Sequence, residues 1–263
     1  MIVFTAGGAL HDAFAARHEC RRVSIRERGA AGVVAALSDG DVLVHNAAAI
    51  AVRSLADALA SNFDPTRALV DALVDARDAS GKRVTLVALS SMSFLGRDGR
   101  PLEALDMSPY AFSKYVAEAY CLKSGVDARA VRFSTLFYRD PKRDGLSAMI
   151  ATAVAKRRIT LLGGGGARRD FLPLSVAVDY LRAIATPTSG PGVYTLAAGV
   201  STSFREVAEM VCEAVPDTSI EDAPATGTPP FVPYEFDAAD VERLGRIRFD
   251  LRDHVRSYAA SLA

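Results

Sequence analysis

A tyrosine and a lysine four residues apart, Tyr110 and Lys114, are the residues of this sequence best suited to proton transfer. On a helix this spacing puts both side chains on one face, one turn apart. An ammonium group there favours the tyrosinate, so the phenol could exchange a proton with a hydroxyl near neutral pH. Such a short pattern recurs by chance, and a Tyr/Lys pair on the surface of an amphipathic helix is the alternative.

Two serines, Ser90 and Ser91, stand where an apolar run over residues 83–89 ends. Sheets of α/β proteins present ligands at the carboxyl ends of their strands. A hydroxyl at that place can hydrogen-bond a reacting oxygen while Tyr110 moves the proton; a pair of turn serines is the alternative. The run that ends in HNAAA (45–49) supplies small residues where the backbone could approach a flat cofactor closely. An ordinary strand-to-helix turn is the alternative interpretation.

The elements around these residues follow a repeating order. Short apolar runs of β type alternate with alanine-rich segments of helical period, the pattern of βαβ units around a parallel sheet buried on both faces. Strands are expected at 1–5, 22–26, 41–46, 83–90, 128–136 and 193–197, and helices at 9–18, 30–37, 65–79, 109–123, 146–156 and 175–185. Asp64-Pro65 is a helix-start signal. The fold class is therefore α/β, a doubly wound, Rossmann-like parallel sheet.

One edge of the sheet and the end of the chain break this regularity. Only 14 residues separate Arg26 from Asp41, which leaves no room for a further strand, so we expect the sheet to be trimmed at that edge. After about residue 136 the sequence becomes turn-rich, with short helices expected at 203–214, 237–244 and 251–262. We expect a first domain over 1–136, with returning elements near 171–198, and a smaller C-terminal lobe over 137–263.

Composition limits the classes of function. The 263 residues include 31 basic and 31 acidic side chains, so no overall field would attract nucleic acid or a membrane; we expect small-molecule partners. Three cysteines, Cys20, Cys121 and Cys212, lie far apart without metal-binding spacing, which predicts free thiols and no metal. No run approaches the roughly 18 apolar residues of a membrane span, and the N-terminus lacks signal-peptide features. A cytoplasmic protein is the expectation.

The order of the motifs identifies a family. Thr5-Ala6-Gly7-Gly8 after a strand is followed by HNAAA (45–49), Asn62 before a helix, SSMSFLG (90–96), YAFSK (110–114), RFSTLFY (132–138) and RRDF (168–171). In this order, over nearly the whole chain, the sequence resembles the extended short-chain dehydrogenase/reductases, which include the nucleotide-sugar epimerases, dehydratases and ketoreductases. The resemblance implies an NAD(P)-dependent oxidoreductase that transfers hydride to or from a carbinol or keto carbon of a nucleotide-linked sugar.

The resemblance also assigns roles to single residues. It implies that Tyr110 is the catalytic acid/base, that Lys114 lowers the pKa of Tyr110 and holds the nicotinamide ribose, and that Ser91 binds the reacting oxygen. The dinucleotide would lie against the first domain, and the smaller lobe would bind substrate. Residues implied to line the dinucleotide are Gly7, Gly8, Leu10, His11, Asn46, Ala47 and Ala48. A homodimer through helices 65–79 and 109–123 is implied as well.

The phosphate turn departs from the family pattern. A dinucleotide fingerprint uses three glycines for a tight turn, close pyrophosphate approach and helix packing, whereas residues 5–12 read TAGGALHD. With Gly8 as the second glycine the loop is one residue short and His11 takes the third position. We expect looser dinucleotide binding or a rebuilt loop. His11 could touch a phosphate, and an incidental histidine is the alternative.

Other departures bear on coenzyme and substrate. Arg26, at the expected end of the second strand, sits where an arginine would accept the extra phosphate of NADP; Glu27 keeps NAD open, and a solvated charge cluster is the alternative. Met92-Ser93 replaces the Asp-Glu pair of the family's sugar dehydratases, so a 4,6-dehydratase is not expected. Thr135 stands at the family's usual Asn in the substrate site, and Arg169 matches the arginine that meets the substrate's diphosphate.

Three hypotheses remain open. The first is an NADP-dependent ketoreductase acting on a nucleotide-linked keto sugar, favoured by Arg26 and by the missing carboxylate pair. The second is an epimerase that keeps NAD tightly bound, oxidises a sugar hydroxyl and returns the hydride to the other face. The third is a catalytically silent dinucleotide-binding protein, suggested by the eroded glycine turn, since fold alone does not guarantee activity.

Overall fold

The computed structural model of the protein describes residues 1–96, 98–186, 189–225 and 239–263, and the chain divides into two compact units. Unit 1 comprises Met1–Gly96, Arg100–Phe133 and Val178–Leu196. Unit 2 is built mainly from Ser134–Ala177 and Ala197–Ala263. The chain therefore leaves unit 1 after Phe133 and returns to it at Val178, for the later part of one helix and for one strand.

Unit 1 contains a six-stranded sheet in the order β2-β1-β3-β4-β5-β9, and every neighbouring pair is parallel. The strands are Ile2–Phe4 (β1), Arg21–Arg22 (β2), Val42–His45 (β3), Thr85–Leu89 (β4), Asp127–Phe133 (β5) and Gly192–Leu196 (β9). Within the described residues β2 is the outermost strand on its side. The predicted Rossmann-like α/β fold with one trimmed edge is confirmed.

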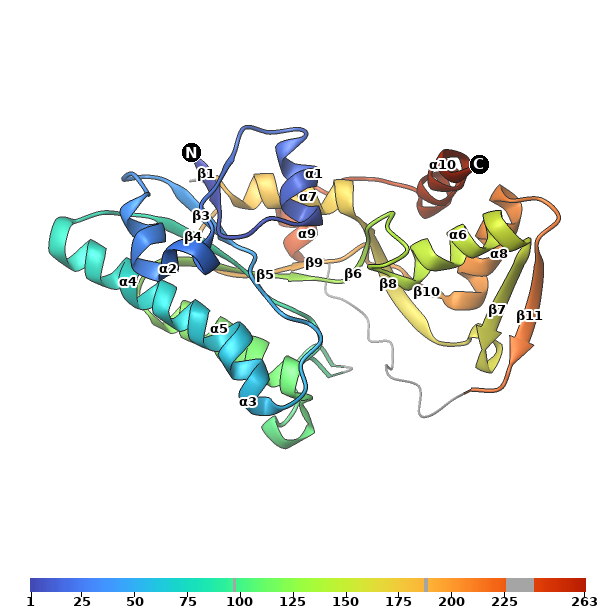
Figure 1. Ribbon diagram of the computed structural model, residues 1–263, viewed down its shortest axis with the longest axis horizontal. Helices are drawn as coiled ribbons and strands as arrows, with labels where there is room; N and C mark the ends of the chain where they lie inside the picture. The colour runs from blue at the N-terminus through green and yellow to red at the C-terminus, as the bar shows by residue number, and fades with distance from the viewer. Residues whose placement is uncertain (97, 187–188, 226–238) are drawn as a thin grey trace. The chain divides into compact units, whose positions relative to one another are not determined.

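Helices cover both faces of this sheet (Figure 1). On one face α2 (Ile25–Ala35), α4 (Asp64–Ser80) and α5 (Pro109–Lys123) lie over an apolar layer that includes Val3, Leu43 and Leu86. On the other face Phe4 packs against Phe14 of α1 (Ala9–Ala15). Successive side chains of a strand point to opposite faces of the sheet. Because helices cover both faces, the strand sequences are continuously apolar.

The second strand is shorter than predicted and ends earlier. The expected strand over 22–26 is wrong, because Ser24 caps a helix that already begins at Ile25, with its Oγ accepting from the Glu27 N–H at 3.3 Å. Arg26 therefore lies on α2, and Arg22 is the residue at the carboxyl end of β2. A serine followed three residues later by glutamate is an N-cap pattern that the strand prediction overlooked.

The helix predicted to start at Asp64-Pro65 is part of a longer run. Ser54 caps α3 (Leu55–Ala58), and a π-helical turn, η1 (Leu59–Phe63), joins it directly to α4. Proline inside a helix removes an N–H and clashes with the preceding turn; the wider π turn accommodates Pro65 at this point. Asp64-Pro65 therefore marks the start of α4 inside a run that begins at Leu55, and the π turn before it carries Asn62.

Unit 2 contains strands that the sequence did not reveal. The predicted strand over 128–136 is broken at Ser134 into β5 and β6 (Thr135–Phe137). β6 pairs with β8 (Arg168–Pro173) and β8 with β10 (Ser201–Ser203), while β7 (Arg158–Leu162) pairs with β11 (Ser219–Ala223). These strands have three to six residues each, too few to show a clear period.

The remaining helices are α6 (Gly145–Lys156), α7 (Leu174–Ile184), α8 (Phe204–Ala214), α9 (Ala239–Arg243) and α10 (Leu251–Leu262), with 3₁₀ turns η2 (Ala104–Asp106) and η3 (Gly163–Gly165). The helix expected at 237–244 lies partly outside the described residues. No helix in the described part of the chain combines the length and apolarity needed to cross a bilayer.

Candidate active site

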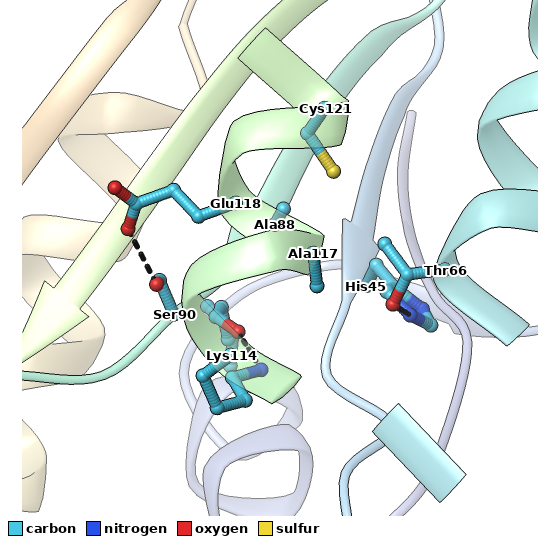
Figure 2. A pocket seen from close by; sticks show the side chains of 9 residues that line it. His45, Thr66, Ala88, Ser90, Lys114, Ala117, Glu118 and Cys121 are labelled. Carbon is cyan, nitrogen blue, oxygen red and sulfur yellow. Dashed lines mark hydrogen bonds between the residues drawn. The ribbon is translucent and has the colours of Figure 1, made fainter. Parts of the chain in front are cut away.

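Helix α5 carries both residues first singled out. It begins at Pro109, which suits the first helical position, after Ser108, whose Oγ accepts from the Ala111 N–H at 3.2 Å. Tyr110 and Lys114 lie one turn apart on this helix. Figure 2 shows Lys114 on this helix. Lys114 is buried, and its Nζ donates to the Leu89 carbonyl oxygen at the end of β4 (2.5 Å).

Ser91 lies two residues after the end of β4 and close to Tyr110. The Ser90 N–H donates to the Val131 carbonyl (2.7 Å), which extends the β4–β5 pairing by one residue and fixes the start of the turn. The Ser91 hydroxyl donates to Ser93 Oγ (2.9 Å) and also lies within hydrogen-bonding reach of the Tyr110 phenol. The structure thus brings Ser91, Tyr110 and Lys114 to the same edge of the sheet.

The protonation of these groups differs from the expectation. Burial raises the pKa of the Tyr110 phenol above its usual value, and the hydrogen bond with Ser91 acts in the opposite direction. Burial lowers the pKa of Lys114 to about 8. The expected lowering of the Tyr110 pKa by Lys114 is not present here, because the ammonium is directed to the Leu89 carbonyl. Tyr110 is therefore protonated at neutral pH.

Asn46 joins two turns that the sequence reading assigned to coenzyme binding. Its Oδ1 accepts from the Ala6 N–H (2.9 Å) and its Nδ2 donates to the Ala6 carbonyl (2.9 Å). This two-point pairing directs both ends of the amide to the turn after β1. Asn46 therefore shapes the turn with its side chain, and the small side chains of Ala47 and Ala48 are left at the sheet edge.

His45 is a buried histidine whose tautomer the contacts define. The Thr66 hydroxyl donates to the Asn62 carbonyl (2.7 Å), so it must accept from His45 Nε2 (3.0 Å). His45 Nδ1 is then free of its proton and accepts from the Thr5 hydroxyl (2.9 Å). Burial, followed by the charge of Lys114, lowers the pKa of His45 to about 3. A neutral imidazole thus links β1, β3 and α4.

Asn62 ties the loop after β3 to α5. Its Oδ1 accepts from the Ala49 N–H (2.7 Å), and its Nδ2 donates to the Ala49 carbonyl (3.0 Å) and to Ser113 Oγ (3.0 Å). Ser113 in turn donates to the Tyr110 carbonyl (2.8 Å). The sequence reading used Asn62 only as a marker of motif order. Pro65, which stands inside a continuous helical run, was the one feature of the sequence that could have indicated the π-helical turn at Leu59–Phe63.

The turn after β1 has space for a phosphate-bearing ligand. Gly8 has φ +115°, and a Cβ there would meet nothing within 4 Å. A Cβ on Gly7 would lie 3.1 Å from Nη1 of Arg22. Arg22 is exposed, and its side chain makes no ion pair or hydrogen bond with any described residue. An open glycine turn beside an unpaired guanidinium fits a dinucleotide, and the sequence reading missed Arg22 because it extended β2 too far.

The other residues assigned to this turn point elsewhere. His11 packs edge-on against the Phe4 ring (centroids 5.3 Å apart) and its Nδ1 lies 2.8 Å from Asp12 Oδ1. Leu10 is buried in the packing of α1. Arg26 is exposed on α2 without an ion pair among the described residues. His11 thus fills the third-glycine position by packing on β1.

Unit 2 holds the residues assigned to substrate. Thr135 starts β6, in register with Phe171 of β8, and Arg169 lies on β8 with its guanidinium 6.0 Å from the Phe204 ring. Asp170 is buried and accepts from the N–H groups of residues 198, 199 and 200 at 2.7–3.2 Å. Asp170 of the RRDF motif therefore anchors the loop that follows β9.

A cavity of about 540 Å³ opens beside this anchored loop in unit 2. Its lining includes Phe171 and Thr202 from the sheet and Arg246, Arg248 and Phe249 from the segment before α10. Arg246 pairs with Glu242 (2.7 Å). Arg248 makes no ion pair within the described residues. The size and the mixture of aromatic and cationic groups fit a small organic anion.

Solved structures with the same fold include enzymes of nucleotide-sugar chemistry. MoeE5 in complex with UDP-glucose and NAD superposes with a TM-score of 0.79 at 22% identity, covering 100% of this chain and 99% of that one. The UDP-glucose 4-epimerase of Thermotoga maritima gives 0.80 at 16% identity, with 99% and 98% coverage. TunA, an NAD-dependent NDP-hexosamine 5,6-dehydratase, gives 0.76 at 21% identity, with 98% and 96% coverage. These likenesses show a shared fold.

A family model gives the assignment directly. The model described as the NAD dependent epimerase/dehydratase family matches residues 8–197, which begin at the last glycine of the turn after β1 and include the Ser91 turn, Tyr110 and Lys114. The match covers well over half of the 263 residues. The chain belongs to the NAD dependent epimerase/dehydratase family, within the extended short-chain dehydrogenase/reductases.

Proposed function

We propose that the protein is an NADP-dependent ketoreductase that reduces a keto carbon of a nucleotide-linked sugar. The observation that carries the proposal is the grouping of Ser91, a protonated Tyr110 and Lys114 at one edge of the unit 1 sheet. A phenol that keeps its proton at neutral pH is the form that serves as a general acid toward a carbonyl oxygen.

The residues divide the reaction among them. A bound dinucleotide supplies the hydride; Gly7, Gly8, Ala47, Ala48 and Arg22 would hold it. Ser91 hydrogen-bonds the carbonyl oxygen of the substrate. Tyr110 transfers its proton to that oxygen as the new C–H bond forms at the carbon. Lys114, whose ammonium donates to the Leu89 carbonyl in this structure, would turn toward the resulting tyrosinate and stabilise it, and the tyrosinate regains a proton from solvent.

The substrate class rests on unit 2. Several structural neighbours hold UDP-glucose or UDP-glucuronic acid, and the unit 2 cavity offers the Phe249 ring and Arg248, which has no ion pair with the described residues. A guanidinium suits a diphosphate and an aromatic ring suits a base. We assign Arg169 and Thr135 to the same substrate. Met92-Ser93 lacks the carboxylates that a 4,6-elimination uses, so the proposal excludes that reaction.

An epimerase is the second candidate, favoured by structural neighbours that are UDP-glucose and UDP-glucuronic acid 4-epimerases. In that reaction Tyr110 would first accept a proton from a sugar hydroxyl and later return one, with NAD retained throughout. The eroded glycine turn keeps the catalytically silent protein as a third candidate. Free thiols at Cys20, Cys121 and Cys212 are consistent with a cytoplasmic location.

A homodimer is part of the proposal. A groove of about 420 Å³ runs between α4 and α5 and is lined by Val70, Val74 and Tyr120, with charged Asp71 and Lys123 beside them. Apolar side chains rimmed by charge on two adjacent helices suit contact with the same surface of a second copy.

Native mass spectrometry of the purified protein tests the function and the subunit count together. The ketoreductase predicts a dimer that arrives without dinucleotide, gains one NADPH per subunit on addition, and consumes NADPH only when a nucleotide-linked keto sugar is present. Retained NAD with NADPH-independent interconversion of sugars would replace this proposal by the epimerase. A protein that binds dinucleotide but turns over neither class of sugar would favour the silent fold.

Arg22 is predicted to select NADP. Arg22→Ala is expected to weaken NADP⁺ binding by roughly 10–100-fold, since a charge-assisted hydrogen bond contributes about 1.5–3 kcal/mol, with NAD⁺ binding changed by less than about 3-fold. Isothermal titration calorimetry measures both constants. Arg26→Ala is the matched control, because Arg26 is exposed on α2 and has no ion pair with the described residues. If only Arg26→Ala loses NADP⁺ affinity, Arg26 on α2, and not Arg22, is the residue that selects NADP.

A further inference from the structure

An ion pair that the reaction scheme does not use lies buried behind Ser91. The Glu118 carboxylate is 5% exposed and the Arg132 side chain 14% exposed. Arg132 Nε donates to Glu118 Oε2 (3.0 Å) and Arg132 Nη2 donates to Oε1, which makes the pairing bidentate. Two parallel hydrogen bonds of this kind fix orientation as well as distance.

The Glu118–Arg132 ion pair contacts the chain on both sides of Ser91. Before the turn, Ser90 Oγ donates to Glu118 Oε2 (2.5 Å), a contact drawn in Figure 2. After the turn, the Phe94 ring lies under the Arg132 guanidinium, 5.0 Å from ring centroid to Cζ. Ser91 thus sits between two residues that are held by one ion pair.

The same acid belongs to the face of α5 that carries the reacting groups. Tyr110, Lys114 and Glu118 are spaced i, i+4 and i+8, which places them along one side of the helix. Any movement of α5 relative to β4 would therefore move Tyr110 and the anchor of Ser91 together.

We propose that Glu118 and Arg132 are positioning residues that hold the Ser91 hydroxyl in register with Tyr110 and support the positive charge of Lys114. The proposal rests on the hydride-transfer function stated above. The ion pair touches neither substrate nor coenzyme in this scheme. It acts through Ser90, Phe94 and Lys114.

The charges around Lys114 give the second part of this role. Burial lowers the pKa of Lys114, while Cys121 and Glu118 on the same helix would raise it. Burial raises the pKa of the Cys121 thiol to about 12, so it is neutral at pH 8. His45 of β3 is neutral as well, since its pKa is about 3. Glu118 is thus the charged group among these that favours the ammonium.

The experiment compares Glu118→Gln with the wild type by two readouts. The first is the pKa of Lys114, followed by ¹³C NMR of lysine side chains. The chain has five lysines, Lys82, Lys114, Lys123, Lys142 and Lys156. Loss of a nearby negative charge should move the Lys114 inflection from about 8 toward neutral pH by roughly 0.5–1 pH unit. This readout needs no turnover, so it separates this proposal from the proposed function.

The second readout is steady-state kinetics. Misplacement of Ser91 should lower kcat by roughly 10–100-fold, with KM changed by less than about 3-fold, and move the basic limb of the pH profile with the Lys114 inflection. Asp41→Asn is the matched control, because Asp41 is another buried acid of unit 1, paired with the N-terminus (3.1 Å) and Arg21 (3.3 Å). The control should keep the wild-type kcat and Lys114 inflection.

Two results would overturn the proposal: a wild-type kcat and Lys114 inflection in Glu118→Gln, or equal losses in Asp41→Asn. If Glu118→Gln does not fold, the double variant Glu118→Gln/Arg132→Gln decides, because it leaves no unpaired buried charge. A folded double variant with lowered kcat supports the positioning role, and one with wild-type kcat removes it. An additive double-mutant cycle in kcat would also contradict the idea that the two side chains act as one unit.

Discussion

Replacing Tyr110 by phenylalanine is expected to lower kcat by roughly 10²–10⁴-fold, the usual contribution of a positioned general acid. The change removes one oxygen and keeps the ring, so packing around α5 should persist. The lost group is the one that meets Ser91 and keeps its proton at neutral pH. Steady-state kinetics with NADPH and a nucleotide-linked keto sugar measures the effect, and calorimetry should show unchanged NADP⁺ binding.

A matched control separates chemistry from folding. Tyr194 lies on β9 of the same unit, is 2% exposed, and donates from its hydroxyl to the Gly190 carbonyl (2.7 Å). Tyr194→Phe removes one buried hydrogen bond and should lower the free energy of unfolding by about 1 kcal/mol without a comparable loss of kcat. Unchanged turnover in Tyr110→Phe would mean that another group supplies the proton.

The sequence predicted the sheet well because its strands are buried on both faces. Five of the expected strands in unit 1 overlap observed ones over most of their length, and α5 was predicted over its whole range, Pro109–Lys123. Ser108 and Pro109 explain that success, since a cap and a proline mark one end of the helix locally. The failure at β2 has the opposite cause: a two-residue strand has no period, and a nearby serine cap was taken for strand.

The candidate site was predictable where single residue types carry chemistry, as with Ser91, Tyr110 and Lys114. It was not predictable where ordinary residues act through contacts between distant segments. Glu118 and Arg132 are 14 residues apart in sequence, and nothing in either residue shows that they close on the same serine turn. The protonation of Lys114 likewise follows from its burial beneath β4, which spacing on α5 does not encode.

Lys114→Met is expected to abolish most turnover and to change how stability depends on pH. The pKa of Lys114 is about 8 in the folded protein and about 10.4 in an unfolded chain. The folded-state pKa is depressed, so between these two values the unfolded state binds more protons, and stability rises with pH. The stability gained when Lys114 is neutral is thus fully present above the unfolded-state pKa and is lost as the pH falls through 8.

The size of the pH-dependent change in stability can be measured by comparing the wild type with Lys114→Met, which lacks the titrating amine. The protonated, buried amine costs about 3 kcal/mol at pH 7 and less than about 1 kcal/mol at pH 10. The free energy of unfolding of the wild type minus that of Lys114→Met should therefore increase by about 2 kcal/mol between pH 7 and pH 10 in urea titrations. Lys156→Met, on the exposed last turn of α6, should give a difference that is flat over this range.

A flat difference for Lys114→Met as well would show that the amine keeps an ordinary pKa, and it would remove the electrostatic basis of the proposed mechanism. A difference in the free energy of unfolding that rises with pH, together with a kcat lowered by at least roughly 100-fold in Lys114→Met, would show that Lys114 lowers stability at neutral pH and is needed for turnover. Stabilising a tyrosinate on the same helix requires a cation that water does not screen. The instability of buried Lys114 at neutral pH is then the consequence of the property that makes it useful in proton transfer.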